Sequence, residues 1–146
     1  LDVFPVLHLA QKCLAEQAAK RREIFVASSS GMLVGYVQLT WLPLYAPYRR
    51  LKIPEIQDLN VVPEQRRQGI GTRLVEACET LVRQTGKFEI GISVGLYARY
   101  GAAQNLYVKM GYIPDGAGVC YDDTPVRMGD LRPVDDLLTL KLMKSL

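Results

Sequence analysis

The pattern of hydrophobic and polar positions divides the first third of the chain into a helix, a hairpin of strands and a loop. Apolar residues at helical spacing predict an amphipathic helix over residues 6–19. Residues 23–27 and 32–42 have the composition of strands, and the polar turn 28–31 between them predicts an antiparallel hairpin. The segment 43–52 contains two prolines and is predicted to be an irregular loop.

The middle of the chain repeats the order strand, helix. One strand is predicted to begin near Ile53, and another to span residues 88–94. Between them, residues 69–85 carry a broad apolar stripe that can cover one face of a sheet. A shorter helix is predicted over residues 102–110, where Gly111 is a common residue at a helix C-terminus.

The last third of the chain begins with turn signals and ends with an alternating segment. Pro114, Asp115-Gly116 and Asp122-Asp123 indicate turns, and residues 137–143 alternate apolar with polar or longer side chains, which predicts a closing antiparallel strand. The chain has 146 residues, of which 49% are hydrophobic, and it contains no repeat, low-complexity tract or linker. We therefore predict a single domain over residues 1–146.

Composition excludes several classes of protein. The net charge of +3 is modest and both signs are interleaved, which argues against nucleic acid as a partner. Cys13, Cys78 and Cys120 lack the spacing of a metal site or a disulfide framework, so we expect packing residues in a reducing compartment and no metal. No apolar run approaches the roughly 20 residues of a membrane span, and no signal peptide is recognisable. We expect a soluble, cytoplasmic protein without a membrane partner, and a homodimer is compatible with this interpretation.

A basic turn with two glycines precedes the helix predicted over residues 69–85. Gly69 and Gly71 allow the backbone to approach a ligand closely, and Arg66 and Arg67 add positive charge. The first free amides of the helix point outward with the positive end of its dipole. The turn is therefore predicted to bind an anion, and its geometry suits a pyrophosphate.

The motifs of the common nucleotide-binding folds do not fit this turn. Leu74 stands where the dinucleotide-binding fingerprint needs a third glycine, and Thr72-Arg73 replaces the Lys-Ser/Thr pair of a P-loop. The sequence Arg66-Arg67-Gln68-Gly69-Ile70-Gly71, preceded by Asp58-Leu59-Asn60-Val61 and a proline, instead resembles motif A of the GNAT superfamily of acyl-CoA-dependent N-acyltransferases. In that family, motif A binds the pyrophosphate of coenzyme A.

A second stretch resembles the same family independently. Residues 103–112, Ala-Gln-Asn-Leu-Tyr-Val-Lys-Met-Gly-Tyr, are similar to motif B, Ala-x-x-Leu-Tyr-x-Lys-x-Gly-Phe/Tyr. Two motifs in the right order identify the family much better than one does. The resemblance covers Glu23 to Tyr112 well, the C-terminal strands loosely and the first twenty residues poorly.

The resemblance implies both a fold and an activity. The fold is a single GNAT-like α/β (α+β) domain: a mixed, mostly antiparallel sheet with helices on both faces and a splayed pair of parallel strands at the acyl-CoA site. The activity is N-acetyl transfer from acetyl-CoA to a small-molecule or peptide primary amine, by direct attack in a ternary complex. The splayed backbone would bind the pantetheine arm, and the Val61 amide would serve as an oxyanion donor. The residues implied for coenzyme A are Asn60, Val61, Val62, Arg66, Arg67, Gln68, Gly69, Ile70, Gly71 and Thr72.

The chemistry of amine acylation requires an acid near the sulfur of coenzyme A, because the thiolate leaves more readily when it can take up a proton. The resemblance gives this role to Tyr107, the tyrosine of motif B. The alternative is a core tyrosine whose hydroxyl is satisfied by the protein. Tyr100 stands where many relatives carry an asparagine that contacts the cofactor, which puts that contact in doubt.

A base is also required, because an amine of the lysine type has a pKa of about 10.4 and is almost entirely protonated at neutral pH. Glu55 has the spacing of the strand glutamate that serves as the base in one branch of the family. In a regular strand, Glu55 would share a face with Gln57, Leu59 and Val61, and a bulge would bring Asp58 to that side instead. Another branch places its base where Gly95 stands here. The structural alternative for either carboxylate is a salt bridge to a nearby cation: Arg49, Arg50 or Lys52.

The acceptor cannot be ranked from the sequence. Trp41, Tyr45 and Tyr48 are candidates to line its pocket, and nearby carboxylates at Asp115, Asp122 and Asp123 either attract a cationic amine or belong to solvated turns. Candidate acceptors are a small amine, an amino acid, an aminoglycoside-like antibiotic and a peptide amine. Two rival functions stay open: a non-catalytic acyl-CoA sensor, which would carry the same motif A, and a binder of another phosphorylated ligand.

Overall fold

The computed structural model describes residues 1–5 and 21–146, so the helix predicted over 6–19 lies outside the described residues. The strands are β1 (Asp2–Pro5), β2 (Arg22–Ser29), β3 (Met32–Thr40), β4 (Glu55–Val61), β5 (Glu89–Gly95), β6 (Ile113–Tyr121), β7 (Thr124–Pro125) and β8 (Leu138–Ser145). The helices of the described part are α2 (Ala46–Leu51), α3 (Ile70–Gln84) and α4 (Gly101–Lys109), with short 3₁₀ turns η1 (Pro63–Gln65) and η2 (Ala98–Tyr100).

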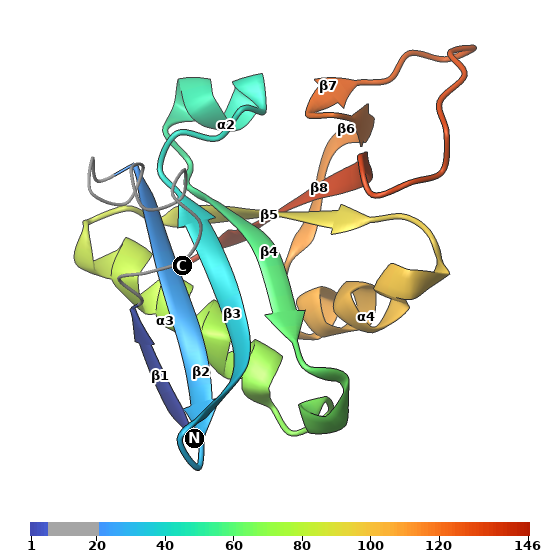
Figure 1. Cartoon of the computed structure of the whole chain (residues 1–146). Helices are drawn as coiled ribbons and strands as arrows, with labels where there is room; N and C mark the ends of the chain where they lie inside the picture. Colours follow the sequence, from blue (N-terminus) through green and yellow to red (C-terminus); the bar gives the residue numbers. More distant parts are fainter. Residues whose placement is uncertain (6–20) are drawn as a thin grey trace.

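All of these strands belong to one eight-stranded sheet in the order β1-β2-β3-β4-β5-β8-β6-β7 (Figure 1). Every neighbouring pair is antiparallel except β4 and β5, which run parallel. This sheet confirms the predicted mixed, mostly antiparallel architecture. The strands and helices predicted between residues 23 and 110 are also present. One further helix occurs where a loop was predicted.

That helix, α2, replaces the predicted loop over 43–52. Pro47 lies in its first turn, where a proline removes only a backbone N–H that has no partner within the helix. Pro47 therefore begins a helix instead of preventing one.

Strand β6 was not predicted from the sequence, because it is irregular. Two of its glycines, Gly116 and Gly118, have positive φ angles, and its pairing with β8 shifts between Pro114 and Val119. Pro114 and Gly116 are turn signals in the sequence, and here they lie in the irregular part of a strand. The short strands β1 and β7 were not predicted either.

Helix α3 covers one face of the sheet and supplies much of the main core. Its apolar stripe is buried against β1 to β5, and Leu74, Val75 and Cys78 are completely buried. Burial of each large apolar side chain contributes about 1.5–3 kcal/mol, so the stripe strongly favours a helix packed on the sheet, as predicted. α4 packs on the same face, where Leu106 approaches the backbone of Gly71 at the start of α3.

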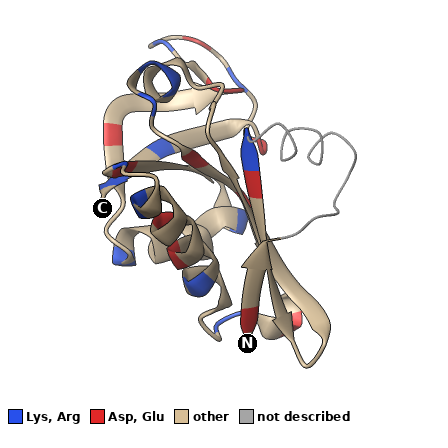
Figure 2. Cartoon of the chain, turned by 90° about the vertical axis from the view of Figure 1, so that its left-hand side faces the viewer, with Lys and Arg blue, Asp and Glu red and all other residues tan. Residues whose placement is uncertain are grey.

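Helix α2 lies on the opposite face of the sheet. Tyr45, Tyr48, Ile53 and Cys120 form a second buried cluster there, and the Tyr48 hydroxyl donates a hydrogen bond to the carbonyl of Leu142. The sheet therefore has helices on both faces, as predicted. In the view of Figure 2, basic and acidic residues are interspersed instead of gathered by sign. Within residues 1–5 and 21–146, no helix has the length and hydrophobicity needed to cross a membrane.

Replacement of Gly91 by alanine tests the packing between β5 and α2. A Cβ atom at this position would lie 2.4 Å from Cε2 of the fully buried Tyr48 ring, so Gly91→Ala is expected to destabilise the fold by about 1–3 kcal/mol. Gly101→Ala is the matched control, because a Cβ at Gly101 meets no atom within 4 Å and alanine favours the helix. Urea unfolding of both variants measures the difference. An unchanged midpoint for Gly91→Ala would contradict the packing described here.

Candidate active site

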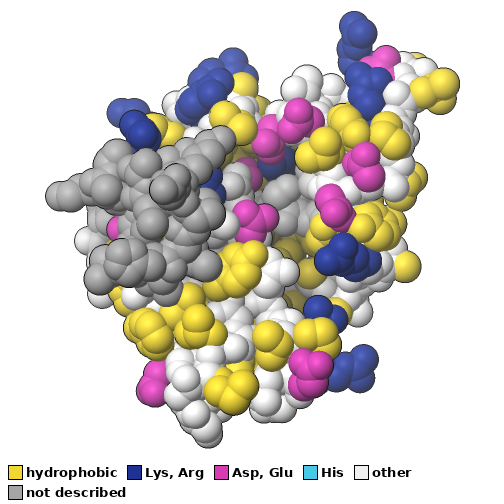
Figure 3. All heavy atoms as spheres, in the orientation of Figure 1, with side chains coloured by type: hydrophobic (Ala, Val, Ile, Leu, Met, Phe, Trp, Pro, Cys, Tyr) yellow, Lys and Arg dark blue, Asp and Glu magenta, His cyan; other side chains and the backbone are white. Residues whose placement is uncertain are grey.

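The strands β4 and β5 part soon after they meet. Their parallel pairing comprises Glu55 with Gly91 and Ile56 with Ile92, while β4 continues to Val61 and β5 to Gly95. A cavity of about 1220 Å³ opens where they diverge. It is lined by the two strands, the turn before α3, one side of α4 and the segments on either side of β7. Figure 3 views this side of the molecule, on which acidic side chains lie near the middle.

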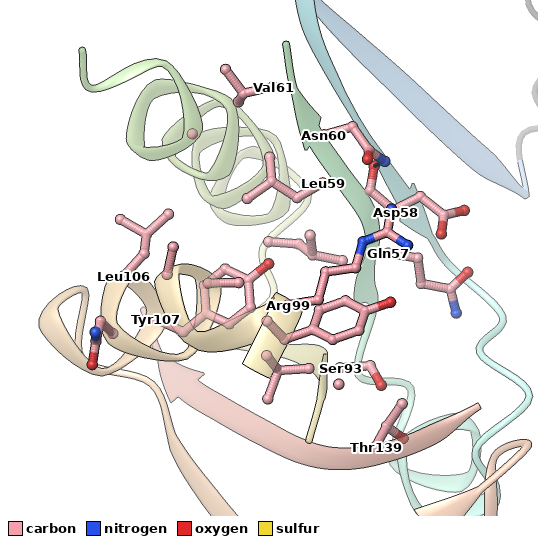
Figure 4. A pocket seen from close by; sticks show the side chains of 18 of the residues that line it. Gln57, Asp58, Leu59, Asn60, Val61, Ser93, Arg99, Leu106, Tyr107 and Thr139 are labelled. Carbon is pink, nitrogen blue, oxygen red and sulfur yellow. Dashed lines mark hydrogen bonds between the residues drawn. The ribbon is translucent and has the colours of Figure 1, made fainter. Parts of the chain in front are cut away.

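A bulge in β4 decides on which side of the strand its later side chains lie. Asp58 and Leu59 together oppose one residue of β3, Val37, and Asp58 has a φ angle of 52°. The bulge turns the Asp58 carboxylate to the side of Gln57, where the amide of Gln38 donates a hydrogen bond to it at 3.0 Å. Leu59 instead packs against the core, and Figure 4 shows it pointing away from Asp58. The face expected for a regular strand is therefore wrong, and the bulged alternative is the one observed.

The predicted anion turn lies at one end of the cavity. Arg67 and Gly69 have positive φ angles of 62° and 78°, and Gly69 caps the N-terminus of α3. A Cβ at Gly71 would lie 3.2 Å from the Leu106 side chain, so this glycine lets α3 and α4 approach each other. Of the ten residues predicted to bind coenzyme A, all except Val62 and Gln68 line the cavity. The turn presents helix amides and two exposed arginines to the cavity, as an anion site requires.

Tyr107 enters the cavity from α4. Its side chain is only 4% exposed, yet no group in the described part of the chain hydrogen-bonds to its hydroxyl. Burial raises the pKa of Tyr107, so the phenol keeps its proton at neutral pH. The alternative prediction of a hydroxyl satisfied by the protein does not fit this arrangement. The Tyr107 hydroxyl is therefore protonated and has no partner among the described residues.

Glu55 is fully buried in a cluster of charged side chains. Both of its carboxylate oxygens lie 3.3 Å from Nζ of Lys141, which also donates to the Asp123 carboxylate at 2.5 Å, and Gln57 donates to Glu55 at 2.9 Å. Burial raises the pKa of Glu55, and the Lys141 ammonium partly opposes that effect. The alternative prediction of a salt bridge to a cation near α2 is wrong, because the partner comes from β8.

The predicted aromatic wall of the acceptor pocket is not observed. Tyr45 and Tyr48 are buried in the second cluster, and neither they nor Trp41 line the cavity. The Tyr45 hydroxyl donates to Asp115 at 2.7 Å, and its ring lies 5.1 Å from Nζ of Lys141. These tyrosines therefore lie behind the charged cluster and support it. They were predicted to line the cavity, but Lys141 lies between them and its carboxylates.

Two residues that line the cavity, Asp136 and Thr139, were not predicted from the sequence. Asp136 accepts hydrogen bonds on one oxygen, Oδ1, from the hydroxyls of both Tyr97 and Tyr100, at 2.6 and 2.8 Å. Thr139 also lines the cavity, and its buried hydroxyl has no hydrogen-bond partner among residues 1–5 and 21–146. Both residues lie about 40 positions after Tyr97, and no local pattern connects them to it. Only the pairing of β8 with β5 brings them to the site.

Comparison with known proteins identifies the class to which this fold and cavity belong. The model of the acetyltransferase (GNAT) domain matches residues 20–114, and the chain belongs to this family. It is also 31% identical over 98 residues to the uncharacterized N-acetyltransferase YhfO of Bacillus subtilis strain 168. That match covers 67% of this chain and 63% of the relative, so the chain spans less than two thirds of that protein.

Solved structures have the same fold at low sequence identity. An acetyltransferase of Bacillus subtilis in complex with CoA matches with a TM-score of 0.68 and 16% identity, over 99% of this chain and 97% of the other. A GNAT family acetyltransferase of Elizabethkingia anophelis with acetyl-CoA bound matches with a TM-score of 0.66, at the same identity and coverage. These likenesses concern the fold.

Removal of the Lys141 ammonium tests the charged cluster. Lys141→Met would leave Glu55 and Asp123 without their shared partner, and we expect a loss of about 3–5 kcal/mol in the free energy of unfolding near neutral pH. Burial raises the folded pKa of Glu55, so without Lys141 this carboxyl lowers the stability of the folded state as pH rises above the ordinary value of 4.5. The stability lost in Lys141→Met should therefore become smaller as the pH is lowered towards 4.5.

The control for this experiment is Lys109→Met, which removes an exposed lysine and should change the free energy of unfolding by less than about 0.5 kcal/mol. Chemical denaturation of both variants over a range of pH measures the two effects. If Lys141→Met lost the same free energy of unfolding at every pH, the ammonium of Lys141 would not act by compensating the carboxylates.

Proposed function

We propose that the protein transfers an acetyl group from acetyl-CoA to a primary amine. The observation that carries this proposal is one cavity with an anion turn at one end, the Tyr107 hydroxyl in its wall and the carboxylate of Asp58 across from it. Membership of the acetyltransferase family supports the donor, and the geometry of the cavity supports the division of roles.

The donor would lie along the parted strands. The pyrophosphate would accept hydrogen bonds from the amides at Gly69 to Gly71, with Arg66 and Arg67 beside it. The pantetheine arm would pair with the β4 backbone at Asn60 to Val62, because this edge has no partner from β5 in the described chain. The amide of Val61 would then face the thioester oxygen and stabilise its negative charge in the transition state.

The reaction would proceed by direct attack. The amine first loses a proton to a carboxylate, and its lone pair then forms the nitrogen–carbon bond to the acyl carbon. The carbon–sulfur bond breaks, the sulfur leaves with the electron pair, and it takes up the proton of the Tyr107 hydroxyl. After the attack the nitrogen loses its second proton, which restores Tyr107 through solvent, and the carboxylate releases the first proton to solvent. An amide, free coenzyme A and one proton are the products.

We assign the base to Asp58 in preference to Glu55. Asp58 is exposed to the cavity, and the amide of Gln38 holds its carboxylate by a hydrogen bond. Glu55 is buried against Lys141 and Gln57, so a proton taken by Glu55 would have to displace these partners. Glu55 would instead hold the charged cluster that supports this side of the cavity.

The acceptor is expected to be a cationic amine. Carboxylates of Asp58, Asp122, Asp123 and Asp136 line the end of the cavity away from the arginine-bearing turn, with Arg99 as a cation among them. Such an arrangement raises the local concentration of a protonated amine. A small amine, an amino acid, an aminoglycoside-like antibiotic and a peptide amine all satisfy this requirement.

Titration with acetyl-CoA and coenzyme A, followed by a free-thiol assay with a panel of amines, tests the function directly. We expect binding of both compounds and release of thiol with at least one cationic amine. Tyr107→Phe is expected to lower turnover by about 10²–10⁴-fold while the dissociation constant for coenzyme A stays close to that of the wild type. Binding without release from any amine would favour the sensor, and tighter binding of another nucleotide would overturn the donor.

The pH dependence of turnover distinguishes the two carboxylates. Asp58→Asn keeps a residue that tolerates the positive φ angle of the bulge, and it should shift the rising limb of the pH–rate profile towards the pKa of the amine itself. Glu55→Gln is the matched comparison, and its rising limb should stay near that of the wild type. The reverse result would transfer the base to Glu55.

A further inference from the structure

The ring of Tyr100 fills the space above Gly95, at the end of β5. A Cβ at Gly95 would lie 2.2 Å from Cδ2 and 2.3 Å from Cε2 of this ring, so the ring rests directly on the backbone. Gly95 has the same orientation in the strand as Gly91, which faces Tyr48, whereas Val94 faces the main core. The ring therefore lies on the side of the sheet that carries Glu55 and Asp58.

Contacts on two further sides hold this ring in place. The Tyr100 hydroxyl donates to Asp136 at 2.8 Å, and Asp136 is fixed in turn by the hydroxyl of Tyr97 at 2.6 Å. The rings of Tyr97 and Tyr100 meet edge to face, with their centroids 5.3 Å apart. The ring of Tyr100 is thus a fixed wall: the β5 backbone, the Asp136 carboxylate and a second ring all restrict its movement.

This wall borders the place where the acyl group would lie. Tyr100, Gly95 and Tyr107 all line the same cavity, at the point where β4 and β5 have parted. The proposed role of Tyr107 puts the thioester sulfur next to its hydroxyl. An acyl chain that extends from this thioester along β5 would meet the Tyr100 ring after a short distance.

We propose that Tyr100 limits the acyl donor to short chains of the size of acetyl, because its ring occupies the space over Gly95 that a longer chain would need. This inference rests on the proposed function, since it requires an acyl-CoA in the cavity. It assigns to Tyr100 a selectivity for the donor. The Asp136 contact would position the ring and would not touch the donor.

Binding of a series of acyl-CoA donors tests this inference without knowledge of the acceptor. Calorimetric titration with coenzyme A, acetyl-CoA and butyryl-CoA should give similar dissociation constants for the first two and a constant about tenfold or more higher for butyryl-CoA. In Tyr100→Ala the penalty for butyryl-CoA should disappear. Tyr100→Phe is the matched control, because it keeps the ring and removes only the hydroxyl, and it should retain most of the penalty.

A second truncation guards against loss of the fold. Tyr100→Leu keeps apolar packing against the core but lacks the far half of the ring, so its penalty should lie between those of the wild type and Tyr100→Ala. Equal affinity of the wild type for acetyl-CoA and butyryl-CoA would overturn the role of Tyr100 and leave the proposed function intact. A penalty that persists in both truncated variants would do the same. Failure of the wild type to bind any coenzyme A compound would instead overturn the proposed function.

Discussion

The parting of β4 from β5 is the constraint on which the rest of the site depends. Ile56 and Ile92 anchor the two strands in the main core, and the pairing ends with these residues. Further along, the bulge at Asp58 bends β4, and α4 packs below β5. The facing backbone edges then no longer pair with each other, and two of their carbonyls accept from side chains instead: that of Val61 from Arg66 and that of Gly95 from Gln104. A group of these edges that keeps no partner in the protein favours a ligand that can pair with it. A continuous sheet would have neither the cavity nor a place for Tyr107 to face.

Charge gives the two ends of the cavity different chemistry. Arg66 and Arg67 stand beside the N-terminus of α3, where the helix dipole adds to their positive potential. The other end is dominated by carboxylates, and one buried ammonium, that of Lys141, compensates two of them. A buried ion cluster of this kind seldom adds stability over an apolar one, so its value here would lie in geometry: it fastens the turn after β6 to the centre of the sheet.

The sequence predicted the parts of the site that depend on local contacts. The turn from Arg66 to Gly71 is set by glycine conformations and by the start of one helix, so its motif is readable in a single stretch. Tyr107 belongs to a similarly local motif. The partners of Glu55 could not be predicted, because Lys141 is 86 residues away and reaches Glu55 only through the order of strands in the sheet. The same holds for Asp136, which meets Tyr97 and Tyr100 from a loop with no motif of its own.

Strand parity was the other limit of prediction. One inserted residue in β4 reverses the faces of all positions after it, and no sequence signal marked Asp58 as the bulged residue. The same uncertainty affected α2, where prolines suggested a loop although one of them lies in a first helical turn. Both wrong predictions concerned residues that occur in two kinds of structure: an aspartate in a regular or a bulged strand, and a proline in a loop or a first helical turn. Only long-range packing selects between the two structures.

A side chain at the end of β5 also leaves a polar group unsatisfied: the hydroxyl of Thr139 has no hydrogen-bond partner in the described part of the chain. A buried polar atom without a hydrogen bond costs about 1–3 kcal/mol, and folded proteins retain few of them. Thr139 pairs with Gly95 across the sheet, so this cost falls at the end of β5 where the Tyr100 ring lies. A ligand that brings a polar atom to this point would remove the cost on binding. The Thr139 hydroxyl is thus available to a ligand near the place where the proposed reaction brings the thioester and the amine together.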